Sequence, residues 1–294
     1  MTKAPGKARK SEASASQNVA YEDCIVSFTD VLGFRHLLKN REAADVMDVL
    51  NQMQLFRQSV DDGKPVKVKE ARLTSRPFAF AMSDAIVRVR PYDTQHRDGA
   101  LVWELIDLVH AQIELVNRGV LVRGGMTVGK AYIGLKGQGP VFGPALARAY
   151  EIETDEAVYP RIVVDDALLE AHRTDKRLWM SGNSYADEER AIDGLLATGD
   201  DGIRYIDYLA QLGEFDSPAH YLLFLERHAA LIRRGREETK ADRRTARKFE
   251  WLARYHNAQV FLQKETVLGS TDRRQSFLEE FDVDAEDFYG AVEV

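Results

Sequence analysis

The segment Tyr21–Arg35, with the sequence YEDCIVSFTDVLGFR, most constrains what this chain can fold into. Its apolar centre is short and bounded by polar residues, which predicts a buried strand. The strand ends in a carboxylate, Asp30, and a helical pattern begins directly after Gly33. A carboxylate at the end of a buried strand is well placed to bind a divalent cation. The alternative is an aspartate that only caps the helix, which is a common arrangement.

The residues after Asp30 predict a place for phosphate. Gly33 lets backbone N–H groups approach a ligand closely because it has no side chain. The start of the following helix supplies free N–H groups and the positive end of a dipole. We therefore expect the backbone of Leu32, Gly33 and Phe34 to contact phosphate. A cation beside bound phosphate is the minimum arrangement for nucleotide chemistry.

The overall composition argues against several classes of protein. The 294 residues carry a net charge of −7 with a pI of about 5.6, which argues against broad binding of nucleic acid. Cys24 is the only cysteine, so no disulfide can form within the chain and a reducing cytoplasm is expected. No apolar run approaches the ~18 residues of a membrane span, so direct membrane insertion is not expected. Residues 1–19 are rich in Lys, Ala and Ser without an aromatic, which predicts a disordered tail.

A second carboxylate is expected at a strand end. The segment 77–91, PFAFAMSDAIVRVRP, predicts a β-hairpin with Asp84 at its turn. Asp84 also fits a purely structural reading, because Ser-Asp is suitable turn chemistry. Elsewhere, helices are expected over 35–60, 98–119, 167–172 and 218–266 and from Pro144 onward; strands over 120–128 and 161–164; a loop or hairpin over 129–139; and a further hairpin over 195–212.

This order of elements predicts the fold class. Local hairpins mixed with helical crossovers indicate an α+β fold with a mixed sheet of the ferredoxin-like kind. We expect residues 20–212 to form one such domain and residues 213–294 to form a helical extension with an acidic tail. The basic run Arg233–Lys248 is interleaved with acidic residues, which favours a solvated helix face over a nucleic-acid site. His256 and Asn257 are expected in the core or at an interface.

Three segments occur in a recognisable order: FTDVLGF at 28–34, SDAIV at 83–87, and VRGGMTVG at 122–129 followed by VFGPALARAYEIE at 141–153. Their order and spacing resemble the catalytic domain of class III nucleotidyl cyclases over roughly residues 21–172. The resemblance implies two divalent cations, Mn²⁺ or Mg²⁺, bound by Asp30, Val31 and Asp84. It also implies a homodimer with shared active sites, in which one chain supplies the metals and the other the base pocket and the charge-stabilising side chains.

More specifically, the chain resembles the bacterial Pycsar pyrimidine cyclases. The discriminating segments are DDGIRYIDYL at 200–209 and WLARYHN at 251–257, which lie outside the general cyclase domain. This resemblance implies a cytoplasmic enzyme that converts UTP to 3′,5′-cyclic UMP and diphosphate for antiphage defence. It further implies a separate effector protein that senses the cyclic nucleotide. CTP as the substrate stays open, because the two bases differ at one hydrogen-bonding group, and so does a non-catalytic nucleotide-binding module.

The positions that read the base depart from the purine cyclases. Phe80 and Pro140 stand where those enzymes carry hydrogen-bonding side chains. Neither residue can hydrogen-bond adenine or guanine through its side chain, so both are expected to line a pyrimidine pocket. Ser83 replaces the glycine that usually precedes the second aspartate.

The positions that stabilise the transition state also depart from the family pattern. The usual Asn and Arg fall on Ala147 and Glu151. Either the chain is inactive or another cation has taken over the role. Arg148, one position along, is the first candidate for the catalytic cation, and Arg123 is the second, although an arginine on a strand can also serve only to brace the sheet.

Overall fold

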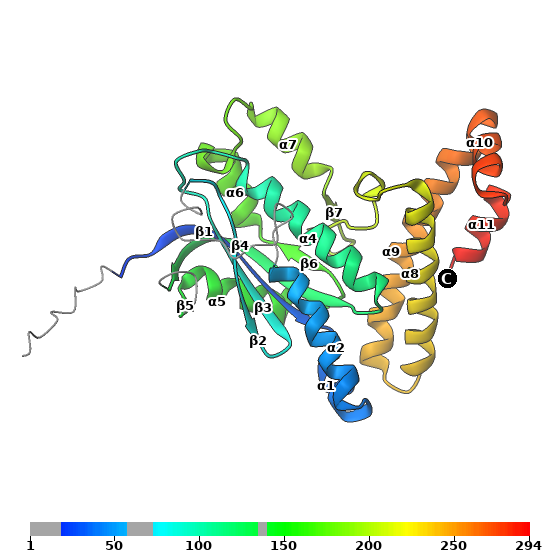
Figure 1. The fold of residues 1–294 in the computed structure, drawn as a ribbon, viewed down its shortest axis with the longest axis horizontal. Helices are drawn as coiled ribbons and strands as arrows, with labels where there is room; N and C mark the ends of the chain where they lie inside the picture. The colour runs from blue at the N-terminus through cyan, green and yellow to red at the C-terminus, as the bar shows by residue number, and fades with distance from the viewer. Residues whose placement is uncertain (1–18, 58–72, 135–139) are drawn as a thin grey trace, which may run out of the picture.

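The computed structural model describes residues 19–57, 73–134 and 140–294 (Figure 1). The predicted disordered tail therefore lies outside the described residues except for Val19, and so does the end of the helix expected over 35–60. The strands are β1 (Glu22–Val31), β2 (Phe78–Met82), β3 (Ala85–Pro91), β4 (Val122–Ile133), β5 (Val141–Phe142), β6 (Ile162–Val164), β7 (Leu196–Thr198) and β8 (Arg204–Ile206).

Helices surround these strands. The α-helices are α1 (Phe34–Asn40), α2 (Ala43–Met53), α4 (Ala100–Asn117), α5 (Pro144–Glu151), α6 (Asp166–Thr174), α7 (Tyr185–Asp193), α8 (Pro218–Glu238), α9 (Arg243–Leu268), α10 (Thr271–Phe281) and α11 (Ala285–Val292). Short helical turns are η1 (Gln54–Arg57), η3 (Ile152–Glu156), η4 (Lys176–Leu178) and η5 (Leu212–Glu214). None of the described helices combines the length and apolar character that crossing a bilayer requires.

The sheet confirms the predicted α+β class. Its strand order is β2-β3-β1-β4-β6-β8-β7. β5 does not stand in this series and pairs with β4. The pairings among β2, β3, β1 and β4 are all antiparallel, and β1 lies in the interior of this group. This is the ferredoxin-like order. β6 then joins β4 in parallel, so the sheet is mixed.

β1 is buried on both faces, which explains its nearly continuous apolar run. Ile25 packs into the large core on the side of α4, whereas Cys24 and Val26 pack into a smaller cluster under α5. Since successive strand residues point to opposite faces, Phe28 and Asp30 lie on the α5 side. The first strand thus presents its carboxylate to the face that α5 covers.

The helix expected over 35–60 is interrupted. α1 ends at Asn40, and Arg41 has an extended backbone (φ −126°, ψ 154°) before α2 begins at Ala43. No glycine or proline stands at this break, so apolar spacing alone did not reveal it. β4 continues past the predicted end of the strand at Val128 to Ile133, and its antiparallel pairing with β5 agrees with the hairpin alternative expected after Val128.

The C-terminal helices share one core with the sheet. α8 and α9 lie side by side (Figure 1), and their apolar residues join the same cluster as those of α4 and β1. The acidic segment 270–294 forms α10 and α11, and its aromatic residues Phe277, Phe288 and Tyr289 are buried. One hydrophobic core therefore includes residues on both sides of residue 212, the boundary expected between the domain and its C-terminal extension.

A buried hydrogen-bond chain connects α8, α9, α11 and the segment that follows β8. His256 Nε2 lies 3.0 Å from the carbonyl oxygen of Val292, which can only accept, so Nε2 donates and Nδ1 of the neutral ring accepts. His228 Nδ1 lies 3.0 Å from His256 Nδ1 and therefore donates to it. The Tyr208 hydroxyl, 2.9 Å from His228 Nε2, then donates to that nitrogen. Every polar atom of the two rings is satisfied only while both histidines are neutral.

These contacts explain the two late sequence segments. Tyr255 of WLARYHN donates its hydroxyl proton to Asp207 Oδ1 at 2.6 Å and accepts from the Leu209 N–H at 3.0 Å. Asn257 exchanges two hydrogen bonds with the backbone of Val294. DDGIRYIDYL and WLARYHN thus form one structural unit, and His256 and Asn257 act within the core, as expected from the sequence.

The neutral histidine pair predicts loss of stability in acid. Burial lowers the pKa of His256 to about 4 and also lowers the pKa of His228. Unfolded histidines bind protons below about pH 6.5, whereas the folded pair resists protonation, so the free energy of unfolding falls as the pH drops from 6.5 towards 4. His256 alone accounts for roughly 3 kcal/mol of this loss. Denaturant unfolding measured between pH 7 and pH 4.5 should show it.

The matched control is His220, an exposed histidine of α8. His256→Gln should reduce the loss of stability in acid, whereas His220→Gln should retain the wild-type dependence. A His256→Gln variant that loses as much stability in acid as the wild type would contradict the assignment.

Candidate active site

The hairpin turn brings the two predicted carboxylates to one edge of the sheet. Asp30 pairs with Ala85 in the register of β1 and β3, directly beside Asp84. The Val31 N–H donates to the Asp84 carbonyl oxygen at 3.2 Å, which ties the turn to the end of β1. Ser83 adopts the left-handed conformation (φ 60°), which explains why glycine suits this position.

Arg123 lies between two carboxylates at this edge. Its Nε and Nη2 atoms donate to Asp30 Oδ1 and Oδ2 at 3.1 and 3.3 Å. Its Nη2 atom also lies 2.5 Å from Glu153 Oε1, and the Glu153 side chain is only 3% exposed. Glu153 was not predicted as a site residue, because nothing in the sequence distinguishes it from other helical glutamates.

Two neighbouring glycines of β4 lie in close contacts, and Gly125 is the one that faces α5 and η3. A Cβ atom on Gly125 would lie 2.5 Å from both the Ala149 carbonyl oxygen and the Ile152 Cβ atom. A Cβ atom on Gly124 would lie 2.6 Å from Thr29 on the neighbouring strand. Gly125 therefore lets α5 and η3 approach β4 closely, which places Glu153 near Arg123, whereas Gly124 lets β4 pack closely on β1.

Burial dominates the electrostatics of the site. It raises the pKa of Glu153 to about 7, and the neighbouring Asp30 charge contributes in the same direction. Burial also raises the pKa of Asp30, whereas the hydrogen bonds from Arg123 lower it and the charge of Asp84 raises it. The carboxylates are close enough to repel one another, so a further cation would be favourable here.

The donor set fits a divalent cation that binds together with phosphate. Within residues 19–57, 73–134 and 140–294, no group of three or more His, Cys, Asp or Glu side chains is arranged to hold a metal ion. Mg²⁺ typically uses only one or two protein carboxylates and completes its shell with water and substrate phosphates. Asp30 and Asp84 supply that number, and Asp30 is a partly buried carboxylate that Arg123 already contacts, so a metal ion would share it with that guanidinium.

The predicted phosphate contacts are only partly available. The Leu32 N–H already donates to the Leu121 carbonyl oxygen at 2.9 Å. The N–H groups of Gly33 and Phe34 have no acceptor in the part of the chain that the structure describes. Gly33 precedes α1 in the left-handed conformation (φ 81°), which favours glycine there.

Arg148, the first candidate for the catalytic cation, lies away from Asp30 in the same chain. It donates to Asp165 Oδ2 at 3.1 Å and lies 2.8 Å from Glu156. Asp165 accepts from Thr127 of β4, whereas Asp30 lies level with Arg123 of the same strand. Arg123 and Thr127 are four residues apart along β4, which corresponds to roughly 13 Å. Arg123, the second candidate, contacts Asp30 directly.

Phe80 and Pro140 are also separated within one chain. Through β3 and β1, the register places Phe80 level with Gly125 on the α5 face of the sheet. Pro140 lies beyond Ile133, where its carbonyl oxygen accepts from the Gly134 N–H. Gly125 and Ile133 are eight residues apart along β4, which corresponds to roughly 26 Å. The two predicted base contacts therefore do not meet along the strand of one chain.

No family model and no curated protein matches the sequence. Among solved structures, the catalytic core of a rhodopsin-guanylyl cyclase with converted specificity, in complex with ATPαS, has a TM-score of 0.41 at 16% identity over 63% of this chain and 96% of that chain. The monomeric guanylyl cyclase domain of the RhoGC fusion protein from the aquatic fungus Blastocladiella emersonii has a TM-score of 0.38 at 15% identity over 64% and 97%.

A class III adenylyl cyclase-like ATP-binding protein from Pseudomonas aeruginosa has a TM-score of 0.36 at 13% identity, over 58% of this chain and 40% of that chain. These structural neighbours are cyclase domains or cyclase-like proteins, and their similarity to this chain is low. The assignment of the α+β class rests on the strand order of this chain itself.

The close approach at Gly125 predicts a sharp difference between two glycines. Gly125→Ala should destabilise the protein by about 1 to 3 kcal/mol, because the added methyl group overpacks the contact between β4 and α5. Gly213→Ala should change stability by less than about 0.5 kcal/mol, since a Cβ atom there meets nothing within 4 Å. Chemical denaturation of both variants checks this, and equal effects would contradict the packing role of Gly125.

Proposed function

We propose that this chain is a nucleotidyl cyclase of the class III type. The observation that carries the proposal is the convergence of Asp30 and Asp84 at one edge of a ferredoxin-like sheet, where the Asp84 charge acts on Asp30. Paired carboxylates at a strand edge are suited to holding the cations that accompany a nucleoside triphosphate.

The proposed reaction is an intramolecular displacement. The ribose 3′-oxygen forms a bond to the α-phosphorus as the bond from that phosphorus to the diphosphate oxygen breaks, and the hydroxyl proton passes to water. Bound divalent cations would favour loss of that proton and offset the charge on the phosphate oxygens. Asp30 and Asp84 would hold these cations, and Arg123 is near enough to Asp30 to orient its carboxylate.

The proposed substrate is a pyrimidine nucleotide, UTP, with CTP as the alternative. Phe80 is half-buried on the α5 face of the sheet, so it can offer an apolar ring to a base and no side-chain hydrogen bond. A smaller base fits such a pocket where a purine would clash. The product, cyclic UMP, would act as a second messenger for a separate effector protein in antiphage defence, as the sequence resemblance implies.

The proposed active form is a homodimer with shared sites. Arg148 and Pro140 lie away from the levels of Asp30 and Phe80 in one chain, so a second chain would be needed to supply them. Large apolar side chains are available for such an interface: Met82, Phe142 and Tyr150 are 58%, 40% and 53% exposed.

A second candidate function is a non-catalytic nucleotide-binding module. One observation favours it: Arg123 already donates two hydrogen bonds to Asp30, in the place where a metal ion would compete. The positions of the usual transition-state residues, Ala147 and Glu151, also lack the expected side chains.

The first test incubates the protein with ATP, GTP, UTP and CTP in turn, with Mn²⁺ or Mg²⁺, and identifies products by mass. Cyclic UMP or cyclic CMP should form, and purine products should be minor. Asp30→Asn and Asp84→Asn should each reduce turnover on the order of 100-fold or more with the fold retained. The matched control, Asp45→Asn, changes an exposed aspartate of α2 and should leave turnover unchanged.

Three results would count against the proposal in different ways. A preference for ATP or GTP removes the pyrimidine assignment but leaves a cyclase. No cyclic product from any triphosphate, with nucleotide still bound, favours the binding module. Near-normal turnover in Asp30→Asn or Asp84→Asn refutes the metal assignment.

The shared site predicts complementation between two inactive chains. Asp30→Ala and Arg148→Ala should each be inactive alone, and an equal mixture should recover about a quarter of wild-type activity, because half of the dimers then hold one complete site of two. The measurement is turnover after subunit exchange, which differently tagged chains confirm. Exchange without recovered activity would exclude a site shared in this way.

A further inference from the structure

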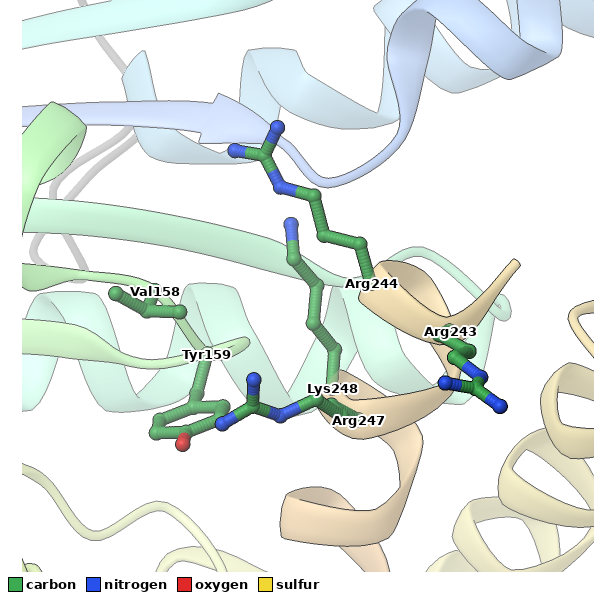
Figure 2. Close-up of a pocket in the computed structure, with 6 residues that line it drawn as sticks. All are labelled: Val158, Tyr159, Arg243, Arg244, Arg247 and Lys248. Atoms are coloured by element: carbon green, nitrogen blue, oxygen red, sulfur yellow. The ribbon is translucent and has the colours of Figure 1, made fainter.

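The start of α9 lines a pocket of about 630 Å³ together with the segment that precedes β6 (Figure 2). Its lining residues are Val158, Tyr159, Arg243, Arg244, Arg247 and Lys248. The basic run was expected to form a solvated helix face, and Arg243, Arg244 and Arg247 are indeed exposed; the last part of the run also lines this pocket. In Figure 2, Arg243 points away from the others, so the pocket charge comes mainly from Arg244, Arg247 and Lys248.

Among the residues that the structure describes, no carboxylate lies within ion-pair distance of Arg244, Arg247 or Lys248. In the described part of the chain, none of these three side chains forms a side-chain hydrogen bond either. The two acids that flank these residues in the sequence are engaged elsewhere: Asp242 accepts from backbone N–H groups and the Thr245 hydroxyl at the helix start, and Glu250 lies 2.7 Å from Arg236. Arg244 and Lys248 stand four residues apart on one helix face, where like charges destabilise the helix. An anion bound in the pocket would remove this repulsion.

The pocket opens at the same edge of the sheet as Asp30. Tyr159 comes shortly before β6, whose first residue pairs with Gly124, directly after Arg123. Figure 2 shows Arg244 and Lys248 extending from α9 toward the end of β1, the strand that carries Asp30. Burial lowers the pKa of Lys248 most, the charges of Arg123 and Arg244 lower it further, and the charge of Asp30 raises it, so these groups share one electrostatic environment.

The wall of the pocket is held rigidly. The Tyr159 ring stacks on Trp251, with ring centroids 5.2 Å apart and planes 6° apart. The buried Arg161 guanidinium lies 5.3 Å from the centroid of the Tyr159 ring and 5.6 Å from that of Trp251. Asp201 holds Arg161 through two hydrogen bonds. Since Trp251 follows Lys248 by one helical turn, this stack fixes the start of α9 against the sheet.

We propose that Arg244, Arg247 and Lys248 bind the terminal phosphates of a nucleoside triphosphate whose α-phosphate lies at Asp30. The location of the α-phosphate rests on the proposed cyclase function, whereas the anion pocket stands on its own geometry. Guanidinium groups match phosphate oxygens with paired hydrogen bonds, and an ammonium group adds a point charge. All three cations come from the same chain as Asp30, so the triphosphate is held without the second subunit.

A single-stranded nucleic acid is the competing ligand for a basic surface. The pocket is a local feature of a chain with net charge −7, whereas non-specific nucleic-acid binding needs an extended positive track. The observations therefore favour a short, highly charged polyphosphate.

The test measures binding of tripolyphosphate and diphosphate by calorimetry, in EDTA so that no metal contributes. The wild type should bind both, and the double variant R244Q/K248Q should bind at least about tenfold more weakly, because two charge-assisted contacts are lost. The matched control is Arg254→Gln, an exposed arginine further along α9, which should keep wild-type affinity. Thermal unfolding should show R244Q/K248Q to be no less stable than the wild type, since it removes repulsion.

Several outcomes would overturn the proposal: no polyphosphate binding by the wild type, equal loss in Arg254→Gln, or a single-stranded RNA that binds more tightly and loses affinity with the same two substitutions. Turnover separates this proposal from the cyclase assignment. Polyphosphate binding that depends on Arg244 and Lys248 without any cyclic product supports the pocket and refutes the cyclase. Wild-type turnover and KM in R244Q/K248Q refute the pocket and leave the cyclase intact.

Discussion

The contact of Arg123 with Asp30 and Glu153 is the interaction on which the proposed site depends. It joins the two interior strands β1 and β4 at the edge where the β2–β3 turn also arrives. Without the guanidinium, two carboxylates would lie close together in a largely buried place, which is strongly unfavourable. The same cation competes with any metal ion for Asp30, so activity and stability impose opposing demands on one side chain.

Much of the fold could be predicted from the sequence because its signals are local. The apolar run before Asp30, the Ser-Asp turn and Pro144 at a helix start each specify one element, and their order specifies the mixed sheet. The break at Arg41 left no such signal, since an ordinary residue takes an extended backbone there. The acidic segment 270–294 packs as two helices because its aromatic rings pack against one another and both helices contact α9, contacts that local composition does not reveal.

The site was less predictable than the fold. The sequence placed Asp30 and Asp84 at strand ends, and the hairpin register brings those ends to one edge. Glu153 was missed because its burial depends on how closely η3 approaches Gly125. The exposure of the α9 arginines was predicted, but the pocket that they line was not, since their position relative to the sheet depends on the Tyr159–Trp251 stack between distant segments. A contact between two segments that are distant in the chain cannot be recognised from the sequence of either segment alone.

The contact of Val292 with His256 also bears on how the chain folds. The apolar face of the sheet that α4 covers includes Ile25, yet the same core is completed by side chains of α8, α9 and α11, more than 190 residues later in the sequence. Contacts with such long sequence separation form slowly, because a large loop must close before they contribute. During synthesis from the N-terminus, part of the apolar core would stay exposed until residues 221–292 had followed, and this is the period in which a chain is most prone to aggregate.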